Sequence, residues 1–274
     1  MKKQVCLLGI LWLVVVEGQL NASVFANEAE ESHNPQIPIE EFVRSLHPHG
    51  VSMTSAIPYK SSNSSASQDN VRTLLEMLNN KDERPFWPTI LDALSTIGPP
   101  SVAPKIIAFI KKLEEKHDLV ADEIRALDAA YWDLGKLIHL NQPGDADEKA
   151  NDELEEASNF LITKIQGREE TPPNQQHGFP PSSQLLGNDS SNEGLIEAKI
   201  LGVAFIATEE AKGEIAKIRA REKDPKFRLF LDQVLLAVHE IQEVGLLCYG
   251  EPESPGCQLQ QIKQRNGKLL SKGR

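Results

Sequence analysis

The chain has 274 residues, of which 40 are acidic and 29 basic, so its formal net charge is −11. Phosphate repels a chain this acidic at long range, and such a chain releases few counterions on binding. The composition therefore excludes a general nucleic-acid-binding protein.

The first 26 residues have the pattern of a secretory signal peptide. Lys2 and Lys3 precede an apolar run from Val5 to Val16, and Val24-Phe25-Ala26 offers small residues for cleavage. The apolar run is shorter than the ~20 residues that span a hydrocarbon core. We expect cleavage after Ala26, a mature chain with a charge of −12 and no membrane span, and a periplasmic or secreted location in a bacterium.

Residues 27–68 are predicted to be a flexible lead-in, because they combine prolines, a serine-rich run and low hydrophobicity. Their one apolar patch, Ile39 to Leu46, predicts a short helix. His47 and His49 raise the possibility of a shared metal, but no carboxylate or thiol cluster accompanies them. A polar turn is the preferred interpretation, and we predict neither a metal nor a cofactor.

Residues 69–166 form the first predicted helical block, since their apolar residues recur at steps of three and four. Ile90 to Ile97 predicts a helix that ends at Gly98, and Val102 to Leu113 predicts the next one. Pro99-Pro100 enforces a tight bend between them. So short a turn predicts that these two helices pack against each other in antiparallel directions. The acid-rich segment from Asp145 to Glu156 is interpreted as a solvated surface.

A Pro/Ser/Asn-rich linker is predicted over residues 167–192, followed by a second helical block over 193–248. The clearest helix of the second block carries an apolar stripe from Phe227 to Ile241. Asp224 is its predicted N-cap, Pro225 its first residue and Gly245 its end. No run of period two bounded by hairpin turns is present, so the predicted class is all-α. Whether the two blocks pack as one rod stays open.

Cys248 and Cys257 are the two cysteines that remain after removal of the leader. A turn-rich loop separates them, and an oxidising compartment favours a disulfide between them. Zinc is the alternative, but two thiols without a nearby histidine pair supply half a site. The acid-free residues after Glu253 make 249–274 a basic tail.

Internal similarity supports a repeated helical unit. Leu94–Val102 aligns with Val203–Ala211, keeping apolar residues at the first, fourth and last positions and small residues at the fifth. Leu134–Leu137 is a weaker third copy.

Ala93-Leu94-Ser95-Thr96-Ile97-Gly98 resembles the HEAT family, including the HEAT-like units named after phycobilisome lyases. The turns Asn80–Arg84 and Lys223–Arg228 resemble the Asp-rich junctions of that family. The resemblance implies a short α-solenoid of antiparallel helix pairs, whose stacked hairpins share one core and leave an outer groove.

Three aromatic residues, Trp87, Tyr131 and Trp132, are candidates for lining such a groove. Packing in the core is the preferred interpretation, and a hydrophobic peptide-binding groove is the alternative. Replacing Trp87 by Ala distinguishes the two. His239 and Glu243 lie four residues apart, but a helical zinc motif requires a second His at the position of Glu243. We expect an exposed His–Glu pair there.

The chain contains no nucleophile elbow, phosphate-binding loop or dinucleotide-binding turn, so no enzyme is predicted. The expected function is a non-catalytic scaffold for protein–protein interaction in the bacterial cell envelope. The alternatives are an exported cell-wall or metal-dependent hydrolase and a lyase-like protein on a helical solenoid. Export argues against the lyase, whose substrates are expected inside the cell.

Overall fold

The computed structural model describes residues 37–46, 64–142, 148–166 and 191–249, and within these ranges the regular structure is entirely helical. The all-α prediction is confirmed. The predicted leader, the His47–His49 turn, most of the linker and nearly all of the basic tail lie outside the described residues. None of the described helices is long and apolar enough to cross a membrane.

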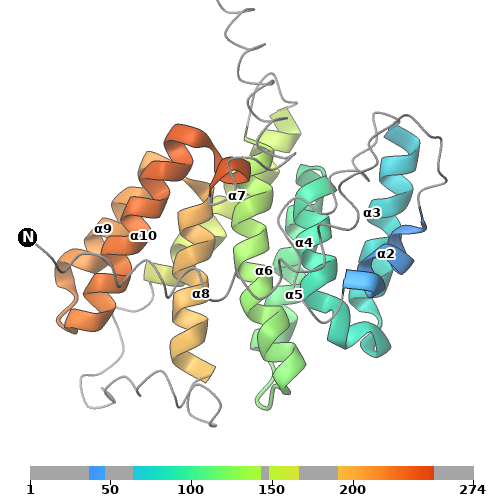
Figure 1. Ribbon diagram of the computed structural model, residues 1–274, viewed down its shortest axis with the longest axis horizontal. Coiled ribbons are helices and arrows are strands. Elements are labelled where there is room, and N and C mark those ends of the chain that lie inside the picture. The colour runs from blue at the N-terminus through green and yellow to red at the C-terminus, as the bar shows by residue number, and fades with distance from the viewer. Residues whose placement is uncertain (1–36, 47–63, 143–147, 167–190, 250–274) are drawn as a thin grey trace, which may run out of the picture.

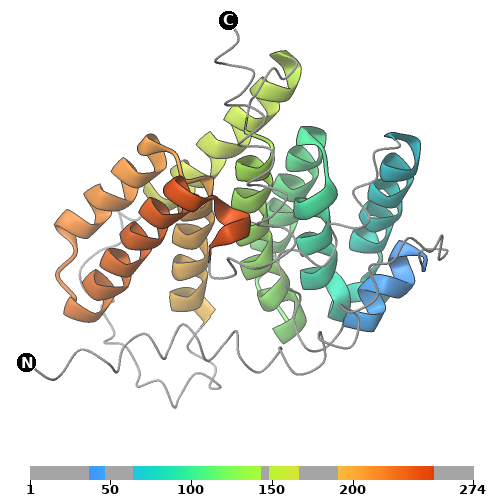
Figure 2. The ribbon, with the colours of Figure 1, turned by 45° about the horizontal axis from the view of Figure 1, so that its top comes forward.

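The helices stand side by side in a row that runs from α2 and α3 at one end to α9 and α10 at the other (Figures 1 and 2). Short 3-10 turns connect several of them. The α-helices are α2 (Ile39–Leu46), α3 (Ser64–Asn79), α4 (Trp87–Ile97), α5 (Ala103–Glu114), α6 (Ala121–Leu140), α7 (Glu148–Gln166), α8 (Ser191–Ile206), α9 (Glu209–Arg221) and α10 (Pro225–Val244). The 3-10 turns are η3 (Lys81–Phe86), η4 (Pro100–Val102) and η7 (Leu246–Cys248).

Local signals set the two ends of α10, as predicted. The carboxylate of Asp224 accepts a hydrogen bond from the backbone N–H of Lys226 at 2.9 Å, and Pro225 is the first helical residue. Gly245 ends the helix with φ 88° and ψ 153°, a conformation that is nearly restricted to glycine. These confirmed ends depend on contacts within a few residues of the chain.

The N-terminal segment is partly as predicted. Helix α2 spans Ile39–Leu46, and its Ile39 and Val43 are buried in the core. However, α3 begins at Ser64, so the flexible assignment of residues 64–68 is wrong. The buried Leu74 anchors α3, and extending an anchored helix by a turn of Ser, Ala and Gln costs little. Composition alone does not reveal this anchoring.

Contacts between helices follow a regular order. Helix α4 packs against α3 and α6, α6 packs against α8, and α8 packs against α10. On the other side, α5 contacts α7, and α7 contacts α9. The predicted packing of α4 against α5 is less extensive than these contacts and includes the edge-to-face contact of Trp87, at the start of α4, with Phe109, near the end of α5. After the bend at Pro99 and the turn η4, α5 packs mainly against α6 and α7.

Side-chain contacts show that α4, α6 and α8 run in the same direction. Lys136 of α6 reaches Asp92 of α4, and further along both helices Asn141 donates to the carbonyl oxygen of Gly98. Between α6 and α8, the Nζ atom of Lys199 lies 5.4 Å from the ring centre of Tyr131. Near the ends of the same two helices, the Nδ1 atom of His139 lies 3.3 Å from the carbonyl oxygen of Ile206.

The two predicted blocks share one continuous core, which extends from Ile39 in α2 to Val238 in α10. They meet where α6 and α8 cross at Gly135 and Gly202. A methyl group on either glycine would overlap the backbone of the opposite helix, so only glycines permit this close approach. The structure therefore packs the blocks together, a question that the sequence left open.

Candidate functional site

Of the three aromatic residues considered as candidates for lining a groove, two are buried and one is exposed. Trp87 is 3% exposed and packs edge-to-face against Phe109, with ring centres 5.1 Å apart. Tyr131 is fully buried, and its hydroxyl donates to Glu114 at 2.6 Å. Because neither side chain reaches a surface, the groove assignment is wrong for both and the core interpretation holds. Trp132, at 41% exposure, is the member of the set that faces solvent.

The structure also describes the predicted His–Glu pair, one of the two cysteines and part of the acid-rich segment. His239 and Glu243 form an exposed pair at 3.4 Å, as expected. Cys248 is disulfide-bonded, but Cys257 lies outside the described residues, so this pairing stays a prediction. In the part of the chain that the structure describes, no three metal-binding side chains come together. The acidic residues Asp152 and Glu155 are exposed on α7, in agreement with a solvated surface.

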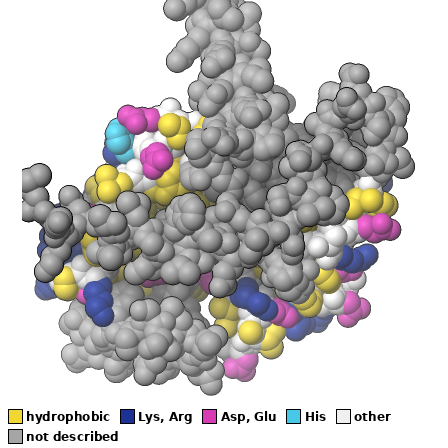
Figure 3. Space-filling model, viewed as in Figure 1, with side chains coloured by type: hydrophobic (Ala, Val, Ile, Leu, Met, Phe, Trp, Pro, Cys, Tyr) yellow, Lys and Arg dark blue, Asp and Glu magenta, His cyan; other side chains and the backbone are white. Residues whose placement is uncertain are grey.

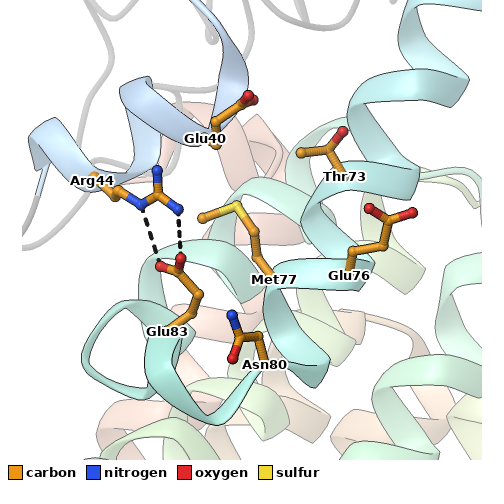
Figure 4. A pocket seen from close by; sticks show the side chains of 7 residues that line it. All are labelled: Glu40, Arg44, Thr73, Glu76, Met77, Asn80 and Glu83. Atoms are coloured by element: carbon orange, nitrogen blue, oxygen red, sulfur yellow. Dashed lines mark hydrogen bonds and ion pairs between the residues drawn. The ribbon is translucent and has the colours of Figure 1, made fainter.

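An open cavity of about 280 Å³ lies at the N-terminal end of the row, between α2, α3 and η3 (Figure 4). The buried Ile39 and Val43 fix α2 on the core, and the buried Leu74 fixes α3. This packing turns the polar faces of the two helices toward each other. The cavity is lined by Glu40, Arg44, Thr73, Glu76, Met77, Asn80 and Glu83.

The charge of this cavity is negative, because its lining contains three carboxylates and one guanidinium. Arg44 pairs with Glu83 at 2.5 Å, and hydrogen bonding to Glu83 raises the pKa of Arg44 (Figure 4). The side chain of Asn80 accepts from the backbone N–H of Asp82 at 3.0 Å and so fixes the start of η3, which carries Glu83. Within the described residues, no ion pair occupies Glu40 or Glu76. These two carboxylates remain available to a positively charged group.

A second polar cluster is buried between α4 and α6. The Nζ atom of Lys136 lies 2.5 Å from a carboxylate oxygen of Asp92, and the hydroxyl of Ser95 lies 2.9 Å from Asp133. Burial, assisted by the charge of Asp92, raises the pKa of Asp133 to about 8. Burial also raises the pKa of Asp92.

The hydroxyl of Ser95 explains how a protonated Asp133 fits this cluster. Ser95 contacts both Asp133 and the carbonyl oxygen of Asp92, at 2.9 and 2.8 Å, but it has a single hydrogen. When Asp133 is protonated it donates to Ser95, and Ser95 donates to Asp92. Both contacts are then hydrogen bonds, and the cluster joins α4 to α6 without an extra buried charge.

Glu114 joins four helices in a similar way. Its carboxylate accepts from Tyr131 of α6 at 2.6 Å and from Lys164 of α7 at 2.5 Å, and it lies 3.4 Å from Lys199 of α8. Burial opposes the ionised form, but the hydrogen bonds from Lys164 and Tyr131 outweigh it and lower the pKa of Glu114. This arrangement stabilises the fold rather than forming a reactive site.

The C-terminal end of α8 is bound by side chains of its neighbours. Its last carbonyl, that of Ile206, accepts from Gln142 at 2.6 Å and lies 3.3 Å from the Nδ1 atom of His139. The next residue, Ala207, has a positive φ of 55°, and its carbonyl accepts from Gln242 of α10 at 3.1 Å. These bonds satisfy helix-end carbonyls that lack partners inside the helix.

The sequence alone predicts neither the cavity nor the two buried clusters. The carboxylates of the cavity come from three segments, and no spacing connects Glu40 with Glu76 or Glu83. One feature of the sequence indicates the α4–α6 cluster, because Ser95 occupies a position where the HEAT-like pattern has glycine. Comparison with known proteins found no matching family model, no similar curated protein and no similar solved structure.

Proposed function

We propose that this protein is a non-catalytic binding protein that holds a positively charged segment of a partner protein in the cavity between α2, α3 and η3. The observation that carries the proposal is the combination of an open cavity of about 280 Å³ with carboxylates on three sides. A Lys or Arg side chain of the partner would pair with Glu40 and Glu76, beside the existing pair of Arg44 and Glu83. Charge-assisted hydrogen bonds of this kind are stronger than neutral ones.

A short HEAT-like solenoid is the proposed frame. Contacts between successive parallel helices join residues 44 apart from α4 to α6 and 35 apart from α8 to α10. From α6 to α8 the separation is 67, and omitting the 24 residues from 167 to 190 reduces it to 43. Similar separations are what a stack of helical hairpins produces. The resemblance of residues 93–98 to the HEAT pattern supports the same frame.

Location in the cell envelope is part of the proposal and is based on the signal-peptide pattern of residues 1–26. The mature chain carries a formal charge of −12. A field of that sign attracts a basic partner over about 8 Å at physiological ionic strength. It would accelerate association with a basic segment and reject an acidic one.

Peptide binding tests the proposal. Tri-arginine is titrated into the protein by calorimetry, with tri-glutamate as the probe of opposite charge. The double variant Glu40→Gln/Glu76→Gln removes two charges without changing side-chain size and leaves Glu83 paired with Arg44. We expect it to weaken binding of tri-arginine at least tenfold.

Glu155→Gln/Glu156→Gln is the matched control, because it removes the same charge from the exposed surface of α7. Its affinity should stay within about twofold of that of the unchanged protein, since distant surface charges are screened. Equal weakening in both double variants would show that net charge, rather than the cavity, binds the peptide. Stoichiometric zinc or iron in elemental analysis would instead favour a metal-dependent hydrolase.

A further inference from the structure

Helix α10 exposes leucines on the side opposite its buried stripe. Phe227, Leu231 and Val238 face the core, whereas Leu229 is 49% and Leu236 is 68% exposed. The two exposed leucines are seven residues apart, which places them two turns, or about 10 Å, apart on one line of the helix. Among the described helices, α9 and α10 lie together at this end of the row, and the main packing contacts of α10 are with α8, α9 and η7 (Figures 1 and 2).

Charges of opposite sign flank these leucines. Lys226 is exposed one turn before Leu229, and Glu240 is exposed one turn after Leu236. In the space-filling view, acidic and histidine side chains gather over one end of α9 and α10, and basic side chains lie toward the other (Figure 3). The outer face of α10 is therefore basic at its N-terminal end, apolar in the middle and acidic at its C-terminal end.

We propose that the outer face of α10 binds the same face of a second copy of this chain, antiparallel and about a two-fold axis. Such an axis brings Leu229 of one copy opposite Leu236 of the other, twice. It also brings Lys226 of each copy opposite Glu240 of the other, within reach of an ion pair. Two copies of a face with this order of charges are complementary when their helices run antiparallel. A parallel arrangement would place like charges opposite each other.

Residues near the two-fold axis are compatible with the dimer. Asp232 would otherwise repel its own copy across the axis, but Arg219 of the same chain neutralises it at 2.7 Å. Gln233 is half-buried beside Asp232, and its amide can donate to and accept from the amide of the second copy. No uncompensated charge is then placed at the centre of the interface.

The size of this face sets the expected affinity. A helix of 20 residues is about 30 Å long, and one of its faces covers less than the ~800 Å² per partner that stable dimers bury. We expect a reversible dimer with a Kd of tens to hundreds of micromolar. The two cavities would then lie at the far ends of the dimer, where two basic segments of one partner could be bound together.

Sedimentation equilibrium from about 10 to 500 µM tests the dimer, with the chain expressed from its full sequence and purified as the host processes it. Lys226→Glu and Glu240→Lys should each weaken self-association at least tenfold, because each places like charges opposite each other twice. The double variant Lys226→Glu/Glu240→Lys restores opposite charges and should restore dimerisation to within about threefold. Leu236→Asp should leave a monomer at every concentration.

Lys105→Glu on α5 and Glu155→Lys on α7 change the same charges at exposed positions away from α10, and they should leave the dimer unchanged. Helical circular dichroism checks that each variant is folded. A protein that is monomeric throughout the range overturns the proposal. So does a dimer that persists in Leu236→Asp, or a double variant that dimerises no better than the single ones. These results do not depend on peptide binding at the cavity, which has its own test.

Discussion

Gly135 of α6 and Gly202 of α8 approach each other so closely that the backbone of one helix fills the place of a side chain on the other. The contact joins the two halves of the core. Gly135→Ala is expected to lower the free energy of unfolding by about 2 to 3 kcal/mol, because the added methyl forces the two helices apart. Denaturant unfolding at 25 °C measures the loss.

Gly213→Ala is the matched control for this prediction. Gly213 lies inside α9, and a methyl group there would meet no atom within 4 Å. The change should raise stability by about 0.5 to 1 kcal/mol through the higher helix propensity of alanine. If Gly135→Ala raised stability as Gly213→Ala does, α6 and α8 would not be in close contact.

Trp87 and Trp132 give a second pair of contrasting substitutions. Trp87 is buried against Phe109, and its indole N–H donates to the carbonyl of Asn80 at 3.3 Å. Trp87→Ala should cost about 3 to 5 kcal/mol, because it leaves a large cavity in the core. Trp132→Ala should cost less than about 1 kcal/mol, since its side chain is 41% exposed. Thermal unfolding compares them, and similar losses would contradict the difference in burial.

The parts of the fold that the sequence predicts are those with local causes. Asp224, Pro225 and Gly245 act on residues beside them in the chain, and the ends of α10 follow. The extensive packing of α4 against α6 depends on residues about 40 apart, and the short turn at Pro99 gives no indication of it.

The difference between local and long-range causes also decides which site residues the sequence predicts. Trp132 follows Tyr131 in the chain but points about 100° away from it around the helix, and spacing alone does not show which of the two is buried. The cavity forms only when the core residue Val43 brings α2 against α3. Glu40 and Glu76 are common surface residues until that packing places them on one cavity.

The raised pKa of Asp133 predicts that the free energy of unfolding decreases as the pH rises from about 4 to about 8. This carboxyl has a pKa of about 8 in the folded protein and an ordinary value of 3.8, so the folded state binds the extra proton. Its contribution is complete below pH 3.8 and is lost as the pH rises through about 8, with a slope of up to about 1.4 kcal/mol per pH unit. Asp133→Asn keeps the side-chain size, cannot ionise and should reduce this slope.

Denaturant unfolding between pH 7 and 8 measures the effect of Asp133 just below its folded pKa, where the expected slope is still large. Asp152→Asn on the exposed surface of α7 is the control and should keep the original slope. An unchanged slope in Asp133→Asn would mean that Asp133 is ionised in the folded protein.

The lowered pKa of His139 predicts the opposite effect, a decrease in the free energy of unfolding as the pH falls below 6.5. The neutral ring has one hydrogen, so Nδ1–H donates to the carbonyl of Ile206 at 3.3 Å while Nε2 accepts from the N–H of Leu246 at 3.4 Å. Burial lowers the pKa of His139 below its ordinary 6.5, although the bond to Ile206 opposes this. A second proton would place Nε2–H against the N–H of Leu246 and release η7 from α6.

The contribution of His139 is complete above pH 6.5 and is lost as the pH falls from 6.5 through the lowered pKa. His139→Gln can keep both hydrogen bonds without a protonation step. We expect it to remove the decrease in unfolding free energy that His139 contributes between pH 6.5 and 5, up to about 1.4 kcal/mol per pH unit. The opposite contribution of Asp133 is common to both proteins and cancels in their difference. His239→Gln, on the exposed face of α10, should leave the decrease as it is. Equal flattening by both substitutions would assign the acid sensitivity to net charge, whereas flattening by His139→Gln alone would assign it to the bonds between α6, α8 and η7.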